Sequence, residues 1–201
     1  MDSDLEMKCP FAVKVQWARD GDATNEAKVA TLMGEQGIGP RVYDSWICDK
    51  TLNYADLWIA QPKPEFCHPV SSSKRTVSFI VMDRLQNGMT LKKYVQEEED
   101  GKFPEALYCA IEQKAYEMYK LGYIHLDLHW NNVYLTSPHP PFKIMLLDFK
   151  STLKTESDSL ITFYLQFMHR ILTTWQVHNT TNAIPKCSMF NRILKDIQHL
   201  L

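Results

Sequence analysis

The sequence predicts an α+β fold, in which a sheet-rich first half is followed by a mostly helical second half. Before residue 85, short runs of β-branched and aromatic residues alternate with turn residues, and after it apolar residues recur at helical spacing. The 201 residues are 45% hydrophobic and 23% charged, which is ordinary for a globular protein. We therefore expect one domain over 1–201, with a reduced N-terminal sheet lobe over 1–85 and a small helical C-terminal lobe over 86–201.

The first half is expected to begin with a strand. In PFAVKVQW (10–17), Phe11, Val13 and Val15 alternate with polar or small residues, as in a half-buried strand. The segment 25–36 has apolar residues near helical spacing, and glycines close it. The other elements expected in this half are strands at 38–49 and 52–60, a loop rich in Pro and Ser at 61–75, and a buried strand at 76–85.

Helices dominate the second half. The segment 104–123 has Pro104 at its first turn and an apolar face, which predicts a long amphipathic helix. Its neighbours along the chain are expected to be a helix at 89–98, a polar loop at 123–135, a turn at 136–141, a short strand at 142–151, a central helix at 157–176 and a final helix at 186–201.

Composition excludes several classes of function. The net charge is −2, so no basic field indicates a nucleic-acid partner. No apolar run reaches the roughly 20 residues needed to span a bilayer, and the acidic N-terminus has no signal core. The five cysteines are scattered and form no C-x-x-C pair, so free thiols in a reducing compartment are expected. We expect a cytoplasmic protein without a membrane partner.

The stretch YIHLDLHWNNVYL, residues 123–135, places polar side chains within an apolar run. His125, Asp127 and His129 alternate as metal ligands do on an extended chain. Asp127 and Asn132 have instead the spacing of a base and a metal ligand in a phosphotransfer loop. From this stretch alone, both readings are open.

Further polar groups fall in the order that a phosphotransfer site requires. Lys14 lies in an expected strand, Glu26 lies on the following helix, and Asp148 ends an expected buried strand. Each alone fits a solvated edge residue, a partner of the helix dipole or a turn residue. Strand Lys, helix Glu, H-x-D-x-x-x-x-N and strand-D-F together indicate phosphotransfer.

The segments AVKV, HLDLHWNN and LLDFK resemble the protein kinase-like superfamily. NEAKVATLMGEQGIGPRVYD and FIVMDRL are similar to the helix-αC and hinge regions of casein kinase 1-like and vaccinia-related kinases. The resemblance spans roughly residues 10–175, and it implies a bilobal kinase-like fold that uses ATP and Mg²⁺. The brevity of the chain suggests a compact, viral member of the family.

The resemblance implies a role for each of five side chains. Lys14 would bond the α- and β-phosphates of ATP, and Glu26 would pair with Lys14. Asp148 would bind the Mg²⁺ that bridges the phosphates, and Asn132 would bind a second Mg²⁺. Asp127 would accept or orient the proton of the substrate hydroxyl.

Other positions are assigned by the same resemblance. His125 is expected to be a packed, hydrogen-bonded scaffold residue. His129 stands where many kinases have a lysine that faces the γ-phosphate, and it could donate a hydrogen bond there. Met82 would neighbour the adenine pocket, and the backbone of Asp83 and Leu85 would hydrogen-bond adenine.

The sequence also departs from the kinase pattern. Only thirteen residues precede Lys14 and none is glycine, so the Gly-rich phosphate loop is missing or cut back. Leu126 replaces the usual arginine, which argues against activation by a phosphorylated loop residue. Lys150 replaces the glycine after Asp-Phe, which argues for a fixed turn.

Three hypotheses follow. The first is a minimal Ser/Thr-type protein kinase, and the second is a pseudokinase that acts as a binding module or decoy; in either case the partner is a protein. The third is a metallohydrolase that uses His125, Asp127 and His129 with His68 or His139 as further ligands, and it leaves Asn132 unexplained. The oligomeric state stays open.

Overall fold

The computed structural model describes residues 9–18, 22–48, 76–97, 102–155, 162–163, 167–189 and 191. Its helices and small sheets confirm the α+β class. The chain divides into two compact units. Unit 1 comprises Met1–Glu35 and Pro40–Leu85, and unit 2 comprises Gln36–Gly39 and Gln86–Leu201.

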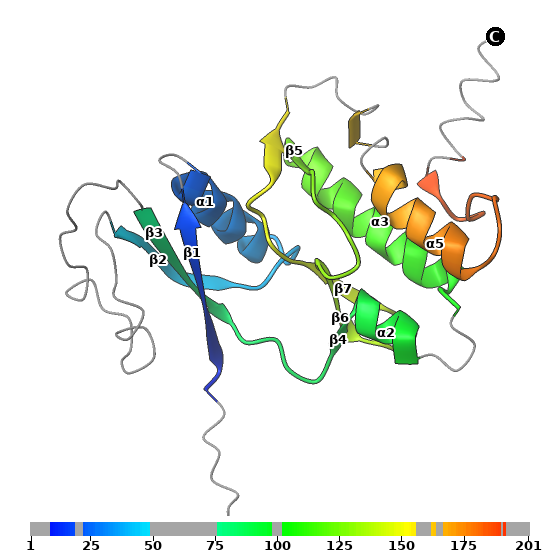
Figure 1. Ribbon diagram of the computed structural model, residues 1–201, viewed down its shortest axis with the longest axis horizontal. Coiled ribbons are helices and arrows are strands. Elements are labelled where there is room, and N and C mark those ends of the chain that lie inside the picture. Colours follow the sequence, from blue (N-terminus) through cyan, green and yellow to red (C-terminus); the bar gives the residue numbers. More distant parts are fainter. Residues whose placement is uncertain are drawn as a thin grey trace, which may run out of the picture. The chain divides into compact units, whose positions relative to one another are not determined.

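The described part of unit 1 is an antiparallel sheet of strand order β1-β3-β2 with the helix α1 packed on it (Figure 1). Its elements are β1 (Phe11–Ala18), α1 (Asp22–Glu35), β2 (Val42–Cys48) and β3 (Thr76–Asp83). The central strand β3 carries the buried apolar residues of the described sheet, Phe79 and Ile80, next to the buried Ser78.

The buried stripe of α1 follows helical periodicity. Glu26, Val29, Ala30 and Met33 stand at i, i+3, i+4 and i+7, and all four are buried. The helix therefore buries a carboxylate in line with its apolar contacts. Gly37 follows with a φ of 65°, a left-handed conformation that ends helices readily.

Unit 2 is organised around the long helix α3 (Glu105–Lys120), whose buried residues Leu107, Tyr108, Ile111, Ala115 and Met118 repeat at helical spacing. Figure 1 shows α3 beside α5, and the Tyr108 and Trp175 rings lie 6.0 Å apart between them. The other elements are β4 (Met89–Thr90), α2 (Leu91–Glu97), β5 (Tyr123–His125), β6 (Val133–Ser137), β7 (Lys143–Leu146), β8 (Thr152–Lys154), the π-helical turn η3 (Met168–Leu172) and α5 (Thr173–His178).

Two small antiparallel sheets lie in unit 2 within the described residues, with strand orders β4-β6-β7 and β5-β8. They correct the expected loop at 123–135, which is a strand, a turn and the start of a second strand. They also correct the helix expected at 89–98, because Met89 and Thr90 pair with β6 before the helix begins. These strands are too short for a period of two to identify them.

The C-terminal part of unit 2 differs from expectation in two respects. A continuous α-helix was expected at 157–176, but its described part contains the π turn η3. Cys109 of α3 and Cys187 form a disulfide, where the sequence predicted free thiols. Beside it, the buried carboxylate of Glu112 accepts hydrogen bonds from the Ser188 hydroxyl at 2.7 Å and the Met189 N–H at 2.8 Å.

Several expected elements cannot be compared with the structure. The strand at 52–60, the loop at 61–75 and most of the final helix lie outside the described residues. Among the described helices, none combines the length and the apolar character required to cross a membrane.

Candidate functional site

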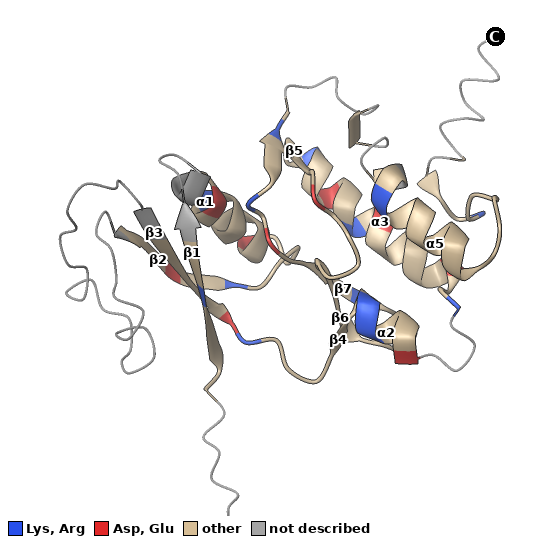
Figure 2. Cartoon of the chain, in the orientation of Figure 1, with Lys and Arg blue, Asp and Glu red and all other residues tan. Residues whose placement is uncertain are grey.

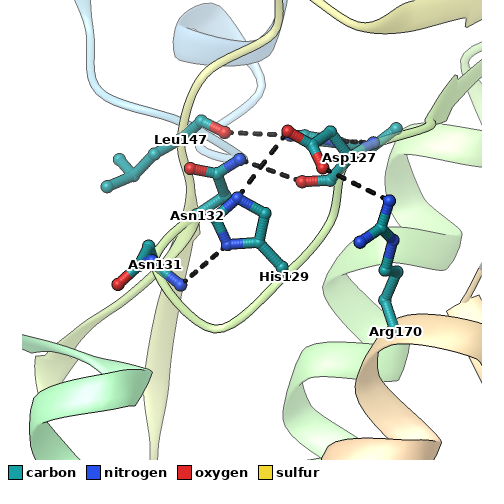
Figure 3. A network of polar contacts seen from close by, with 7 residues as sticks. Asp127, His129, Asn131, Asn132, Leu147 and Arg170 are labelled. Carbon is teal, nitrogen blue, oxygen red and sulfur yellow. Dashed lines mark hydrogen bonds and ion pairs between the residues drawn. The ribbon is translucent and has the colours of Figure 1, made fainter.

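The turn between β5 and β6 is fixed by hydrogen bonds that converge on Asn132. Its side-chain amide donates to the Asp127 carbonyl at 2.9 Å, and its backbone N–H donates to the His129 carbonyl at 2.8 Å. The Leu147 N–H donates to the Asn132 carbonyl at 2.9 Å. Asn132 is buried, and the use of its Nδ2 as a donor leaves its Oδ1 as an oxygen ligand (Figure 3).

His125 ties the start of this turn to the strand β7. Its Nε2 lies 2.9 Å from the Leu147 carbonyl, and its Nδ1 accepts the Asp127 N–H at 3.2 Å. Because Nδ1 accepts, the ring is the neutral tautomer that donates from Nε2. Burial lowers the pKa of His125, although the Leu147 carbonyl opposes this shift. His125 thus has the hydrogen-bonded, packed position that the sequence predicted for it.

Asp127 projects its carboxylate out of this fixed turn, with 43% of the side chain exposed. The His129 Nε2 lies 3.6 Å from one carboxylate oxygen, and an Arg170 nitrogen lies 3.7 Å from the other. Figure 3 shows both side chains beside Asp127. Each separation exceeds hydrogen-bond length, so the carboxylate can still accept a proton or a hydrogen bond from a ligand.

Sequence reasoning missed Arg170. It stands on η3, 43 positions after Asp127, and the chain between the two carries no motif that links them. The contact arises because η3 lies next to the 125–132 turn, and only tertiary structure could reveal it.

Asp148 follows β7 in a left-handed backbone conformation with a φ of 59°, and its side chain is exposed. The next residue, Phe149, is buried, and its ring lies 5.8 Å from the His125 ring. Gly39 packs so closely against the Phe149 ring that a Cβ added to Gly39 would lie 2.7 Å from that ring. The turn is fixed further by the Thr152 hydroxyl, which donates to the Phe149 carbonyl at 2.7 Å.

In unit 1, Lys14 and Glu26 form an ion pair with an N–O distance of 2.5 Å. The Glu26 side chain is 2% exposed and the Lys14 side chain 27%. The Gln16 amide donates to the second oxygen of Glu26. The structure thus brings together the lysine and glutamate that the sequence singled out, although twelve positions separate them.

The three positions assigned to adenine lie at the end of unit 1. Met82 is half-buried in β3, between Ala12 and Val42 of the neighbouring strands. The Asp83 N–H donates to the Arg41 carbonyl at 2.9 Å, so this N–H is not free for adenine. Leu85 is half-buried at the boundary of the unit.

The metal triplet of the hydrolase hypothesis does not form in the described part of the chain. Both ring nitrogens of His125 are engaged, and no group of three His, Cys, Asp or Glu side chains there could hold a metal ion. His139 is exposed on a turn, and His68 lies outside the described residues. The remaining reading of this stretch is the phosphotransfer loop.

A comparison with known families agrees with that reading. Residues 51–184, about two thirds of the chain, match the model of the lipopolysaccharide kinase (Kdo/WaaP) family. The match includes Asp127, Asn132 and Asp148, and it does not extend to Lys14 and Glu26. No curated protein matches the chain.

Proposed function

Because the chain belongs to the lipopolysaccharide kinase (Kdo/WaaP) family, within the protein kinase-like superfamily, we propose that it transfers the γ-phosphoryl group of ATP to a hydroxyl group. One observation carries the proposal. An exposed Asp127 carboxylate stands on a turn whose backbone is fixed by His125 and Asn132. A base held in one place while its carboxylate stays accessible is what in-line transfer to a hydroxyl requires.

In the proposed reaction, the acceptor oxygen forms a bond to the γ-phosphorus as the bond from phosphorus to the β–γ bridging oxygen breaks. ADP leaves, and the hydroxyl proton passes to Asp127. Arg170, close to Asp127, adds positive charge where the transferred group carries negative charge, and His129 can donate a hydrogen bond from Nε2 because its Nδ1 accepts the Asn131 N–H.

The donor set around Asp127 fits Mg²⁺, which prefers hard oxygen ligands. The Oδ1 of Asn132 and the exposed Asp148 carboxylate are such ligands. When bound, the ion would neutralise charge on the phosphates. Lys14, positioned by the buried Glu26, is assigned to the α- and β-phosphates. Met82, the Asp83 carbonyl and the Leu85 backbone are assigned to adenine, because the Asp83 N–H already donates to Arg41.

The acceptor predicted from the sequence is a Ser or Thr hydroxyl of a protein in the cytoplasm. The family name points to a second class, a sugar hydroxyl of lipopolysaccharide. Asp127 would serve either alcohol. Radiolabelled ATP offered with casein in one reaction and with purified lipopolysaccharide in another separates the two, since label enters only the true class of acceptor.

Nucleotide binding separates this enzyme from a pseudokinase that only binds a partner protein. We expect Mg·ATP to raise the melting temperature. Asp127→Asn should abolish phosphotransfer and leave nucleotide affinity largely intact, whereas Asp148→Asn should weaken binding of the metal–nucleotide complex. The absence of a thermal shift at millimolar Mg·ATP, or unchanged transfer by Asp127→Asn, would refute the proposal.

A further inference from the structure

A cavity of about 310 Å³ lies in unit 2 next to the proposed base. We call it the Arg170 pocket. Its lining comes from the 125–132 turn, η3 and α5 and includes His129, Trp130, His169, Arg170, Thr174 and His178. His129 and Arg170 also contact the Asp127 carboxylate. A ligand in this pocket would therefore lie beside the group that takes the acceptor proton. The volume suits a small molecule.

The lining of the pocket is suited to an anion. It contains one guanidinium and three imidazoles, and none of its residues is acidic. The sequence of α5, TTWQVH, adds no charged carboxylate or ammonium group, as its uniform tan in Figure 2 shows. In the described part of the chain, the single ion pair of Arg170 is the 3.7 Å contact with Asp127. A guanidinium has five N–H donors in a planar fork that matches phosphate, so most of them are available.

The position of Arg170 gives an independent reason to assign it a function. It stands in a π-helical turn, a rare element that occurs frequently at functional sites. Its side chain is 42% exposed. The π turn thus places a long basic side chain, open to solvent, at the edge of the pocket that faces Asp127.

We propose that the Arg170 pocket binds the phosphate group of a small acceptor that is already phosphorylated, so that Asp127 acts on another hydroxyl of the same molecule. The claim that the bound molecule is phosphorylated at another hydroxyl rests on the proposed function. The claim that the pocket binds a phosphate ester does not. Arg170 would be the residue that determines specificity, with the histidines as further donors. The volume matches one small molecule, and a phosphorylated protein segment is the alternative that the test below includes.

The contact between Arg170 and Asp127 makes a distinctive prediction. A bound phosphate and the Asp127 carboxylate compete for the same guanidinium. Asp127→Asn removes one competitor and one negative charge near the ligand. This variant should therefore bind a phosphorylated ligand more tightly than the wild type, although it has lost phosphotransfer.

Isothermal titration without ATP tests the inference on the full chain. The probes are glycerol 3-phosphate, ribose 5-phosphate and glucose 6-phosphate, each compared with its unphosphorylated parent. We expect at least one phosphate ester to bind and its parent alcohol not to bind. Arg170→Gln should weaken binding about tenfold or more, because a charge-assisted bidentate contact is lost. Arg170→Lys should restore part of it, and Lys143→Gln, which removes an exposed cation outside the pocket, should change nothing.

The inference would be overturned if none of the three esters bound, or if each ester bound no better than its parent alcohol. Unchanged binding by a folded Arg170→Gln variant would also overturn it. So would tighter binding of a phosphoserine peptide than of every ester. The two proposals can fail separately. Arg170-dependent binding of an ester with no binding of Mg·ATP would refute the proposed function alone. Phosphotransfer that Asp127→Asn abolishes, together with ester binding that Arg170→Gln leaves unchanged, would refute this inference alone.

Discussion

Lys14→Met would leave the Glu26 carboxylate buried without its cation. Removing one partner of a buried ion pair costs about 3–5 kcal/mol. Two features reduce that cost here, since Lys14 is 27% exposed and Gln16 still donates to Glu26. We therefore expect the free energy of unfolding to fall by about 2 kcal/mol.

A second substitution separates this structural role from the proposed catalytic one. In Lys14→Met/Glu26→Gln the buried group is neutral, so about half of the lost stability should return, while phosphotransfer should stay absent in both variants. Urea unfolding measures the stability, and label transfer measures the activity. The control is Lys28→Met, which removes an exposed lysine of α1, the helix that carries Glu26, and should change stability by less than about 0.5 kcal/mol.

Two results would refute this reasoning. If Lys14→Met alone were as stable as Lys28→Met, the burial of the Glu26 carboxylate would not depend on its ion pair with Lys14. If the double variant were no more stable than the single one, the loss would not come from an unpaired carboxylate.

Three other predictions concern unit 2. Gly39→Ala should cost about 1–3 kcal/mol and lower phosphotransfer, because the new Cβ displaces the Phe149 ring beside Asp148, the proposed metal ligand; a fully active variant would contradict this. Glu112→Ala should cost about 3 kcal/mol by urea unfolding, whereas Glu117→Ala on the same helix should cost less than about 1 kcal/mol, because only the first is buried; equal losses would contradict this. The lowered pKa of His125 means that the unfolded chain takes up its proton first, so this contribution to stability is present above about pH 6.5 and is lost as the pH falls below it. His125→Gln should therefore show a weaker loss of stability between pH 7 and pH 5, and a slope equal to that of the wild type would contradict the assignment.

The sequence anticipated the features that depend on periodicity or local motif. The long helix α3 and the buried stripe of α1 both follow a helical repeat, and the polar residues at 125–132 follow a compact motif. Glu26 could be singled out only by its order relative to Lys14, since a glutamate near a helix start is usually solvated. The roles of these residues in catalysis stay predictions.

The features that the sequence did not predict depend on contacts between residues far apart in the chain or on very short strands. Arg170 reaches Asp127 because η3 packs beside the turn, and no spacing encodes that distance. The Cys109–Cys187 disulfide joins residues 78 positions apart, and scattered cysteines give no pairing signal. The strands β5 and β8 have three residues each, too few for alternation to appear.

The left-handed backbone at Asp148 limits which side chains that position can carry. Besides glycine, asparagine and aspartate tolerate this region best, because their short polar side chains bond locally to the backbone. Alanine or glutamate there would combine a chemical change with a conformational penalty. Asparagine alone is nearly the same size, keeps the fold of the turn and removes the charge, so Asp148→Asn is the appropriate variant for measuring what the carboxylate contributes. Replacement by other residues would add the conformational penalty and overstate that contribution.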